Sequence, residues 1–367
     1  MSVVIPVKGR VALLRAQLAS LRVAMNRSPV PTEVVVVDDS DPDDAAAHEA
    51  SCREFGARYV TGPRHVGAKR NLGVERASYD LILFTDSDCR VPPDVFERHV
   101  ATLRGADASV GGVAGPTYVE HGDARASRIM RWSKLINDDL ERPRRCATVT
   151  WATTTNLAVR REVFEEVGGF PSESLDHVGG EDCDLGLKMS DAGYRIVCDP
   201  DVVVVHDEAI VDSLVTAGRR LYGYGRSEQW VCKVHPRHRR PALNACTVVA
   251  GAAVAGLALA SRTGGRSLLA APAALALVVG LRARGLRSNG QGTRGQDTRG
   301  LGAQDRAGDD RSVRTTAERL ACAAVDLMFD LGGFVAALEL GRPGMVFTGL
   351  APADGDPGAS NRSRSRS

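Results

Sequence analysis

Leu81-Ile-Leu-Phe-Thr-Asp-Ser-Asp88 is the most informative segment of the chain. A short apolar run leads directly into two carboxylates, Asp86 and Asp88, and Cys89-Arg-Val-Pro-Pro93 follows them. This pattern predicts a buried strand that ends in a loop. Carboxylates at positions i and i+2 of such a loop suit Mg²⁺ or Mn²⁺. An Asp-rich turn without a metal has the same local sequence, so the rest of the chain must decide between the two interpretations.

The composition of the chain is that of an ordinary globular protein. Its 367 residues are 43% hydrophobic and 25% charged, and the formal net charge is +2. This charge argues against a dedicated nucleic-acid-binding protein. The eight cysteines include no Cys-x-x-Cys pair, which favours reduced thiols inside a cell. Because residues 3–7 are predicted to enter a strand at once, we expect no cleaved signal peptide and a cytoplasmic catalytic part.

Two other apolar runs precede the first one. Val3 to Val7 and Val34 to Val37 are continuous and do not alternate with polar residues, which is typical of parallel strands buried on both faces. Between them, apolar residues recur every three or four positions from residue 11 to residue 25 and predict an amphipathic helix. A strand–helix–strand unit collects its ligands at the carboxyl ends of its strands, where Asp38 and Asp39 are expected to lie.

A basic segment bracketed by glycines, Gly67-Ala-Lys-Arg-Asn-Leu-Gly73, is predicted to open a helix. A helix N-terminus with Lys69 and Arg70 suits an anion, although a solvated basic helix start has the same sequence. The segment lacks the Gly-Lys-Ser/Thr ending of a P-loop, and no G-x-G-x-x-G follows the first strand. Both absences argue against a P-loop ATPase and a dinucleotide-dependent dehydrogenase.

The order of the motifs resembles that of the family 2 glycosyltransferases, whose fold is called GT-A. The resemblance covers about residues 2 to 230. Its motifs are Val3-Val-Ile-Pro-Val7, Val34-Val-Val-Val-Asp-Asp39, Arg70-Asn-Leu-Gly73, Thr85-Asp-Ser-Asp88, Thr154-Thr-Asn-Leu-Ala-Val-Arg160, Val167-Gly-Gly-Phe170, Gly180-Glu-Asp-Cys-Asp-Leu185 and Pro200-Asp-Val-Val-Val-Val-His206. It implies an α/β fold, in which a mostly parallel sheet is flanked by helices, and a nucleotide-diphospho-sugar transferase.

The resemblance also implies roles for residues around the nucleotide sugar. In such enzymes the end of the first strand and the aspartate that closes the second hold the base and ribose, and an Arg-Asn pair lies beside the nucleotide. The threonines and amide of residues 153–156 are expected to line the sugar, although a polar loop would look the same. The residues expected to bind the nucleotide sugar are Pro6, Val7, Asp39, Arg70, Asn71, Asp86, Thr155, Asn156 and Glu181.

The metal and the catalytic base are implied in the same way. Asp86 and Asp88 would bind the divalent cation, Mg²⁺ or Mn²⁺, and His206 would complete its shell, unless His206 only bonds to nearby backbone. Asp182 would be the general base, and direct displacement with one base would give inversion. The alternative for Glu181-Asp182 is a pair of first-turn acids that complement the helix dipole.

The C-terminal part of the chain has a different composition. We expect the catalytic domain over residues 1–230, a basic segment with an apolar helical hairpin over 231–281, a flexible low-complexity linker over 282–317, an apolar helix over 318–350 and a disordered tail over 351–367. The Gln-x-x-Arg-Trp motif of processive synthases is absent. This absence favours a non-processive enzyme that transfers one sugar or a few.

The hairpin of residues 231–281 contains two apolar stretches, Ala245 to Ala260 and Leu268 to Leu281. Each is shorter than the roughly 20 residues that normally span a bilayer, and basic clusters flank the pair. We expect a short hairpin in or on the cell membrane, with the catalytic domain facing the cytoplasm; the alternative is a soluble Ala-rich helical pair.

Together these observations predict a membrane-associated, inverting glycosyltransferase. The expected donor is a UDP-sugar, and the acceptor could be a lipid carrier, a peptide-derived metabolite or a secondary metabolite. Two alternatives stay open. One is a nucleotidyltransferase of similar fold, and the other is an inactive, membrane-tethered protein that binds nucleotide sugars.

Overall fold

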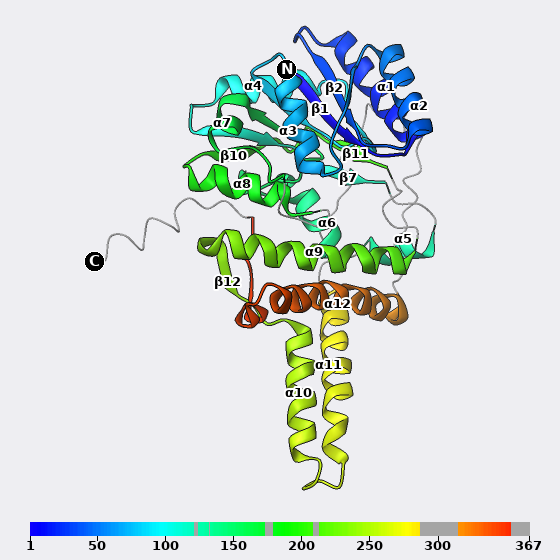
Figure 1. Ribbon diagram of the computed structural model, residues 1–367, viewed down its shortest axis with the longest axis vertical. Helices are drawn as coiled ribbons and strands as arrows, with labels where there is room; N and C mark the ends of the chain where they lie inside the picture. The colour runs from blue at the N-terminus through cyan, green and yellow to red at the C-terminus, as the bar shows by residue number, and fades with distance from the viewer. Residues whose placement is uncertain (121–123, 132, 173–178, 208–212, 287–314, 354–367) are drawn as a thin grey trace, which may run out of the picture. The chain divides into compact units, whose positions relative to one another are not determined.

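The chain forms two compact units, which are seen here in a computed structural model (Figure 1). The structure describes residues 1–120, 124–131, 133–172, 179–207, 213–286 and 315–353. The first unit comprises Met1–Glu120, Asp138–Glu208 and Pro352–Ser367, and the second comprises His121–Asn137 and Ala209–Ala351.

An eight-stranded sheet forms the centre of the first unit, with the strand order β3-β2-β1-β4-β9-β6-β10-β8. Strands β3, β2, β1 and β4 are mutually parallel, whereas β9 runs antiparallel to both β4 and β6. The strands are β1 (Ser2–Val7), β2 (Glu33–Asp38), β3 (Arg58–Thr61), β4 (Leu81–Phe84), β6 (Val110–Ala114), β8 (Thr148–Val149), β9 (Leu157–Arg160) and β10 (Arg195–Cys198). The mostly parallel sheet predicted from the apolar runs is confirmed.

Helices cover both faces of this sheet, as the unbroken apolar strands require. Alternate residues of β1 belong to separate cores: Val3 packs with Leu14 of α1 on one face, and Val4 packs with Leu185 of α8 on the other. The first face is covered by α1 (Val11–Arg27), α2 (Pro42–Phe55) and α4 (Val95–Gly105). The second is covered by α3 (Val66–Arg76), α7 (Arg161–Glu166) and α8 (Glu181–Asp191).

A small second sheet lies beside the loop that follows β4. It consists of β5 (Cys89–Arg90), β11 (Val204–His206) and β7 (Thr117–Val119), in the order β5-β11-β7. Because β11 pairs antiparallel with β5, His206 lies opposite Cys89. The short helices α6 (Lys134–Glu141) and η1 (Arg142–Arg144) precede β8.

The second unit contains two long helices, α9 (Leu214–Val234) and α12 (Thr316–Glu339), that pack with their backbones in close approach. A Cβ atom on Gly225 of α9 would lie 1.9 Å from the carbonyl oxygen of Phe329, and one on Gly332 of α12 would lie 2.0 Å from that of Tyr222. Only glycine therefore fits at these two positions. The unit also contains α5 (Arg125–Met130), η2 (Pro236–His238), η4 (Pro343–Phe347) and the strand pair β12 (Arg239–Pro241) and β13 (Thr348–Leu350).

The two apolar stretches form a helical hairpin, α10 (Ala245–Leu259) and α11 (Ala270–Gly285), joined through η3 (Arg266–Leu269). The hydroxyl of Ser267 in η3 donates to the carbonyl oxygen of Gly256 in α10 at 2.6 Å, and this bond links the two sides of the hairpin near its turn. By length and composition alone, Arg266–Gly285 and Thr316–Glu339 could each cross a membrane.

The structure revises two of the predicted boundaries. Residue 230 lies inside α9, which continues because the chain offers no helix breaker before Pro236. The helix expected over 318–350 ends at Glu339, since Gly341 and Pro343 stop it. Most of the predicted linker (282–317) and most of the predicted tail (351–367) lie outside the described residues.

Candidate active site

Arg70 joins two of the predicted motifs at the carboxyl edge of the sheet. Its Nη2 donates to Oδ1 of Asp86 at 2.9 Å, and its Nη1 donates to Oε1 of Glu181 at 2.8 Å. Asp86 follows β4, whereas Glu181 is the first residue of α8. The Arg70 side chain is only 3% exposed and that of Glu181 8%, so this pair is shielded from water, whereas Asp86 is 29% exposed. The loop after β4 and the start of α8 are therefore held at one place.

His206 lies against Asp88, with Nε2 3.3 Å from Oδ1. The pairing of β11 with β5 brings it there, and the backbone N–H of Asp207 donates to the carbonyl oxygen of Asp88 at 2.8 Å. Both side chains are buried. Burial and the neighbouring Asp86 raise the pKa of Asp88, while His206 and Arg10 oppose that rise.

The same pair of residues passes a chemical test for a divalent-cation site. Nδ1 of His206 lies 2.9 Å from the carbonyl oxygen of Asp207, to which it can only donate, so in the neutral ring Nε2 carries the lone pair. A lone pair facing a carboxylate oxygen is unfavourable unless a proton or a cation lies between them. The Sγ atom of Cys89 is close to both groups, but burial raises its pKa well above the usual range and keeps it a thiol. The donor set is therefore carboxylate and imidazole, which suits Mn²⁺ and, less well, Mg²⁺.

Arg10 also contacts this carboxylate, through Oδ2 of Asp88. It lies in the turn between β1 and α1, and its backbone is left-handed, with φ 61° and ψ 43°. The motifs of the sequence give Arg10 no role. No sequence signal marks it, because a left-handed conformation is uncommon for arginine.

Asp182 lies in the first turn of α8, next to Glu181. Gly179 and Gly180 lead into the helix with positive φ values of 124° and 86°, which side-chain-bearing residues rarely adopt. Oδ1 of Asp182 accepts from the backbone N–H of Cys183 at 2.8 Å. Burial, followed by the negative charge of Glu181, raises the pKa of Asp182 to about 7. A carboxylate with this pKa can take up and release a proton near neutral pH.

Only one carboxylate oxygen of Glu181 is hydrogen-bonded within the described part of the chain. Its Oε1 is bonded to Arg70, while the buried Oε2 has no hydrogen-bond partner among the described residues. A buried carboxylate oxygen without a donor is costly in a native protein. This oxygen is thus a candidate contact for a substrate hydroxyl.

Lys69 organises the neighbouring strand ends. Its buried ammonium group donates to the carbonyl oxygen of Val7 at 2.9 Å and to Oδ1 of Asp39. Lys8 lies 3.6 Å from the other oxygen of Asp39. The structure thus brings together Val7, which follows the buried Pro6 in β1, and Asp39. Lys69 was recognised in the sequence as part of an anion site, but its pairing with Asp39 was not foreseen.

Two residues predicted to contact the nucleotide sugar, Asn71 and Asn156, form hydrogen bonds within the protein. Both ends of the Asn71 amide are bonded to the backbone of Phe170, each at 2.9 Å. The Asn156 amide is buried and is bonded to His99 and to the carbonyl oxygens of Pro116 and Val202. These amides therefore hold backbone segments in place, and the binding of the nucleotide sugar by Asn71 and Asn156 stays a prediction.

Thr155 is bonded to two other hydroxyls, that of Thr117 at 2.7 Å and that of Thr153 at 2.9 Å. Asp184, a further acid in the first turn of α8, is buried and paired with Lys188 at 2.6 Å. Because Asp184 is engaged by Lys188, Asp182 is the better candidate for the general base.

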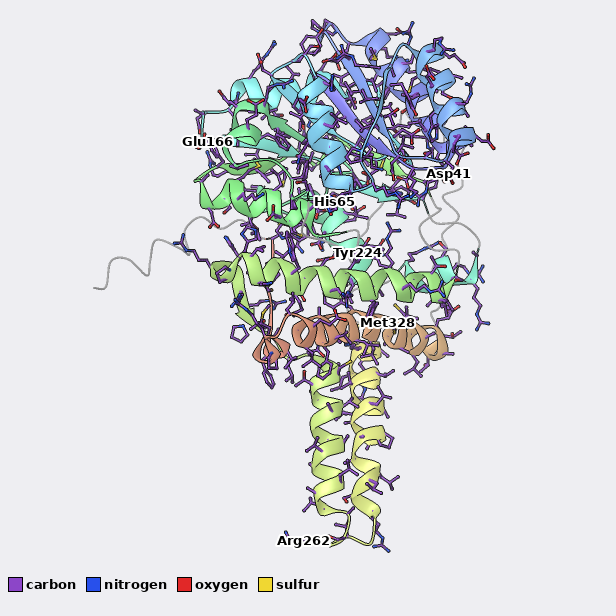
Figure 2. The ribbon with its side chains drawn as sticks, in the orientation of Figure 1. Asp41, His65, Glu166, Tyr224, Arg262 and Met328 are labelled. Atoms are coloured by element: carbon purple, nitrogen blue, oxygen red, sulfur yellow. The ribbon has the colours of Figure 1, made fainter. Side chains whose placement is uncertain are left out.

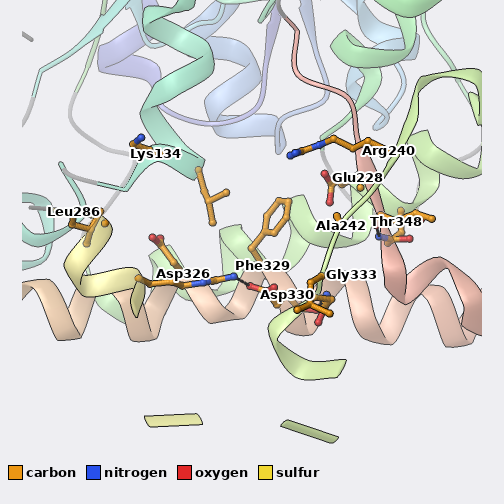
Figure 3. Close-up of a pocket in the computed structure, with 17 residues that line it drawn as sticks. Lys134, Glu228, Arg240, Ala242, Leu286, Asp326, Phe329, Asp330, Gly333 and Thr348 are labelled. Atoms are coloured by element: carbon orange, nitrogen blue, oxygen red, sulfur yellow. Dashed lines mark hydrogen bonds and ion pairs between the residues drawn. The ribbon is translucent and has the colours of Figure 1, made fainter. Parts of the chain in front are cut away.

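A cavity of about 390 Å³ lies in the second unit, and none of the predicted site residues lines it (Figure 3). Its carboxylates are engaged by the protein itself: Asp330 pairs with Arg282 at 2.6 Å, and Asp326 accepts from the Ser133 hydroxyl at 2.6 Å. The cavity is therefore separate from the site of Arg70 and Asp182.

Comparison with known proteins agrees with this geometry. Residues 2–168 match the family described as glycosyl transferase family 2. Glycosyltransferase AglE of Haloferax volcanii is 30% identical over 207 residues, which cover 54% of this chain and 64% of that protein. Pre-mycofactocin glycosyltransferase of Mycobacterium tuberculosis is 27% identical over 219 residues, which cover 56% of this chain and 42% of that protein. The chain thus spans less than two thirds of the length of each of these relatives.

A solved structure shares the fold. Mannosyltransferase PcManGT from Pyrobaculum calidifontis, in complex with GDP-Man and Mn²⁺, has a TM-score of 0.53 and 19% sequence identity, and covers 91% of this chain and 86% of that chain. The sheet, its flanking helices and this likeness define a GT-A-like fold. The match of residues 2–168 and these relatives support the family 2 glycosyltransferases, a family of transferase enzymes, as the family of this chain.

Proposed function

We propose that the first unit transfers a sugar, with inversion, from a nucleoside-diphosphate sugar to an acceptor hydroxyl. The observation that carries this proposal is the pair of bonds by which Arg70 joins Asp86 to Glu181. These bonds hold the Asp-x-Asp loop and the helix that bears Asp182 at one edge of the sheet. The match of residues 2–168 to the glycosyltransferase family supports the donor class, and a UDP-sugar is the donor we expect.

Asp182 is the proposed general base. The acceptor oxygen forms a bond to the anomeric carbon while the bond from that carbon to the diphosphate oxygen breaks, and the electron pair of the broken bond stays on the diphosphate. Asp182 takes the proton of the acceptor hydroxyl, a contribution of about 10²–10⁴-fold for a positioned base. A single displacement of this kind inverts the configuration at the anomeric carbon.

The remaining site residues have supporting roles in this proposal. Asp88 and His206, together with Asp86, would hold Mg²⁺ or Mn²⁺, which supplies positive charge beside the departing diphosphate. The strand ends at Val7 and Asp39, held by Lys69, would bind the base and ribose. Free Oε2 of Glu181 would accept a hydroxyl of the donor sugar.

The test is an assay with a panel of UDP-, GDP- and dTDP-sugars and Mn²⁺. We expect one donor class to release a nucleoside diphosphate, and D182N to bind that donor while losing release. Release of pyrophosphate would favour the nucleotidyltransferase alternative, and D182N with wild-type turnover would reject Asp182 as the base. Lipid carriers, peptide-derived metabolites and secondary metabolites can then be tested as acceptors with the donor so identified.

We also propose that the hairpin of α10 and α11 inserts into the cell membrane. Its large apolar side chains face outward: Leu257 is 66% exposed and Leu277 is 62% exposed. Residues 245–261 and 267–281 contain no charged residue. Apolar helices with this exposure have a higher free energy in water than in the hydrocarbon of a membrane, so transfer into lipid is favourable.

Charges mark both ends of the hairpin. Arg262 lies at its tip (Figure 2), with Arg266 close by in the sequence, and Arg240, Arg282 and Arg284 flank its root. The 15 residues of α10 extend about 22 Å, somewhat less than the ~30 Å hydrocarbon core, and long arginine side chains can bridge such a difference. The start of α10 and the end of α11 lie at the same end of the hairpin, and the basic residues there favour the cytoplasmic side of the membrane. The eight free cysteines of the chain also favour a location in the cytoplasm.

Membrane fractionation tests the insertion. We expect the wild type to sediment with membranes after a high-salt wash and the L257D/L277D variant to be released. V215D is the matched control, because Val215 of α9 is 63% exposed but lies outside the hairpin. Retention of L257D/L277D in the membrane fraction would reject the hairpin as the anchor.

A further inference from the structure

Arg10 holds an unusual backbone conformation directly beside the candidate cation site. It is the one non-glycine residue with positive φ in the part of the chain that the structure describes. Conformations of this kind persist only where the surrounding structure imposes them, and they cluster at functional sites. The left-handed backbone of Arg10 must therefore be imposed by its neighbours, and it sets what the side chain of Arg10 contacts.

The cause is a buried network that fixes the turn before α1. The backbone N–H of Gly9 donates to Oγ of Ser40 at 2.7 Å, and the backbone N–H of Ser40 donates to Oδ1 of Asp38 at 2.8 Å. The fully buried His48 lies 2.9 Å from Oδ2 of Asp38, and the Tyr59 hydroxyl donates to the same oxygen at 3.0 Å. The carboxyl end of β2 thus dictates where the turn that carries Arg10 lies.

The consequence is a guanidinium group on Asp88. Arg10 contacts Oδ2 of this carboxylate, while Oδ1 faces His206 at 3.3 Å. The Arg10 side chain is 48% exposed, whereas that of Asp88 is 4% exposed. The cation therefore reaches a buried carboxylate from the solvent side and leaves half of its own surface open to a ligand.

We propose that Arg10 is a resident counter-cation that weakens divalent-cation binding until the donor arrives. A divalent cation held by Asp88 must share that carboxylate with Arg10, and the two positive charges repel each other. A diphosphate beside them supplies negative charge that relieves the repulsion. Cation and donor therefore bind cooperatively, and linkage makes the effect reciprocal. Only the role of the diphosphate rests on the proposed function.

Titration of Mn²⁺ into the full-length protein, followed by electron paramagnetic resonance, tests the proposal. Without nucleotide, we expect R10Q to bind Mn²⁺ about fivefold more tightly than the wild type, the factor expected for loss of one partly exposed charge pair. R10K keeps the charge and should stay close to the wild type. With UDP or GDP present, the gain in Mn²⁺ affinity should be smaller in R10Q than in the wild type.

Two further variants separate this effect from general charge or folding effects. R15Q removes the same charge from α1, but Arg15 pairs with the exposed Glu54 at 2.5 and 2.6 Å, so its Mn²⁺ affinity should equal that of the wild type. R10G removes the charge and suits the left-handed backbone, so it should reproduce R10Q with a folded protein.

Several results would overturn the proposal. Mn²⁺ binding by R10Q and R10G that is no tighter than that of the wild type would do so, as would an equal effect of R15Q. If neither UDP nor GDP tightens Mn²⁺ binding by the wild type, the coupling to the donor is rejected. Failure of the proposed function would show separately, as the absence of turnover with every donor in the panel.

Discussion

Arg70 and Glu181, which are 111 residues apart in the sequence, form a buried ion pair with 2.8 Å between Nη1 and Oε1. The pair ties α3 to the first turn of α8, and the second bond of Arg70, to Asp86, ties both to the end of β4. One guanidinium thereby aligns the predicted base and the Asp-x-Asp loop, and its planar fork suits two carboxylates at once.

Replacing Arg70 should cost stability as well as activity. R70M leaves the buried Glu181 without its partner, so we expect the free energy of unfolding in urea to fall by about 3 kcal/mol or more. R70K keeps the positive charge but lacks the planar guanidinium group, so its free energy of unfolding should lie between those of R70M and the wild type. Equal stability of R70M and the wild type would show that this pair does not hold the two motifs together.

The pH dependence of transfer should follow Asp182. Its pKa is raised to about 7, so the proton-accepting form increases as the pH rises from 6 to 8, and turnover should rise with it. D182N should lose this rising limb together with about 10²–10⁴-fold of the rate. The limb is measured as turnover against pH at saturating donor, and a D182N variant that keeps it would assign the limb to another group.

The pH dependence of the free energy of unfolding gives an independent measure of the raised pKa of Asp182. The folded protein keeps the proton of Asp182 up to about pH 7, whereas the unfolded chain releases it near the ordinary aspartate value. The unfolded state therefore binds fewer protons between about pH 4 and pH 7, and the contribution of Asp182 to stability falls with rising pH across this window. D182N should remove that contribution, which urea denaturation at a series of pH values can detect.

Asp88 and His206 should matter to cation binding in different degrees. D88N removes a charged ligand, so we expect both Mn²⁺ binding and transfer to be severely weakened. H206A removes an imidazole ligand and should weaken Mn²⁺ binding by about 10–100-fold. The loss should be larger for Mn²⁺ than for Mg²⁺, because imidazole is the poorer partner for Mg²⁺. Mn²⁺ affinity of H206A equal to that of the wild type would remove His206 from the metal shell.

Asn156 should behave as a structural residue. N156A removes the donor to the carbonyl oxygen of Val202 and one of two donors to that of Pro116, so we expect a loss of about 1–3 kcal/mol in the free energy of unfolding. The KM for the donor should stay unchanged in the folded fraction. A large rise in KM without a loss of stability would favour the prediction that Asn156 binds the sugar.

Much of the fold could be predicted from the sequence because the strands are unbroken apolar runs. Val3 to Val7 and Leu81 to Phe84 have few alternatives to buried strands, and each is followed by its site residues at the carboxyl end. The antiparallel insertion of β9 between β4 and β6 was not foreseen, since a four-residue strand carries no sign of its partner.

The side chains of the site were less predictable. The sequence does not distinguish an amide that binds a sugar from one that bonds to the backbone, and the amides of Asn71 and Asn156 donate to backbone carbonyl groups. Arg10 was missed because its approach to Asp88 depends on a backbone conformation set by Ser40 and Asp38, which are far away in the sequence. Such contacts arise from tertiary structure and leave no local pattern.

The pairing of β11 with β5 gives His206 its place by main-chain register alone. Side chains alternate between the two faces of a strand, so a slip of one residue would turn the imidazole to the opposite face. Inserting or deleting a single residue just upstream of β11 would thus remove the imidazole from Asp88 while every amino acid of the site remained in the chain. For this reason the spacing of the final motif is as much a part of the site as its histidine.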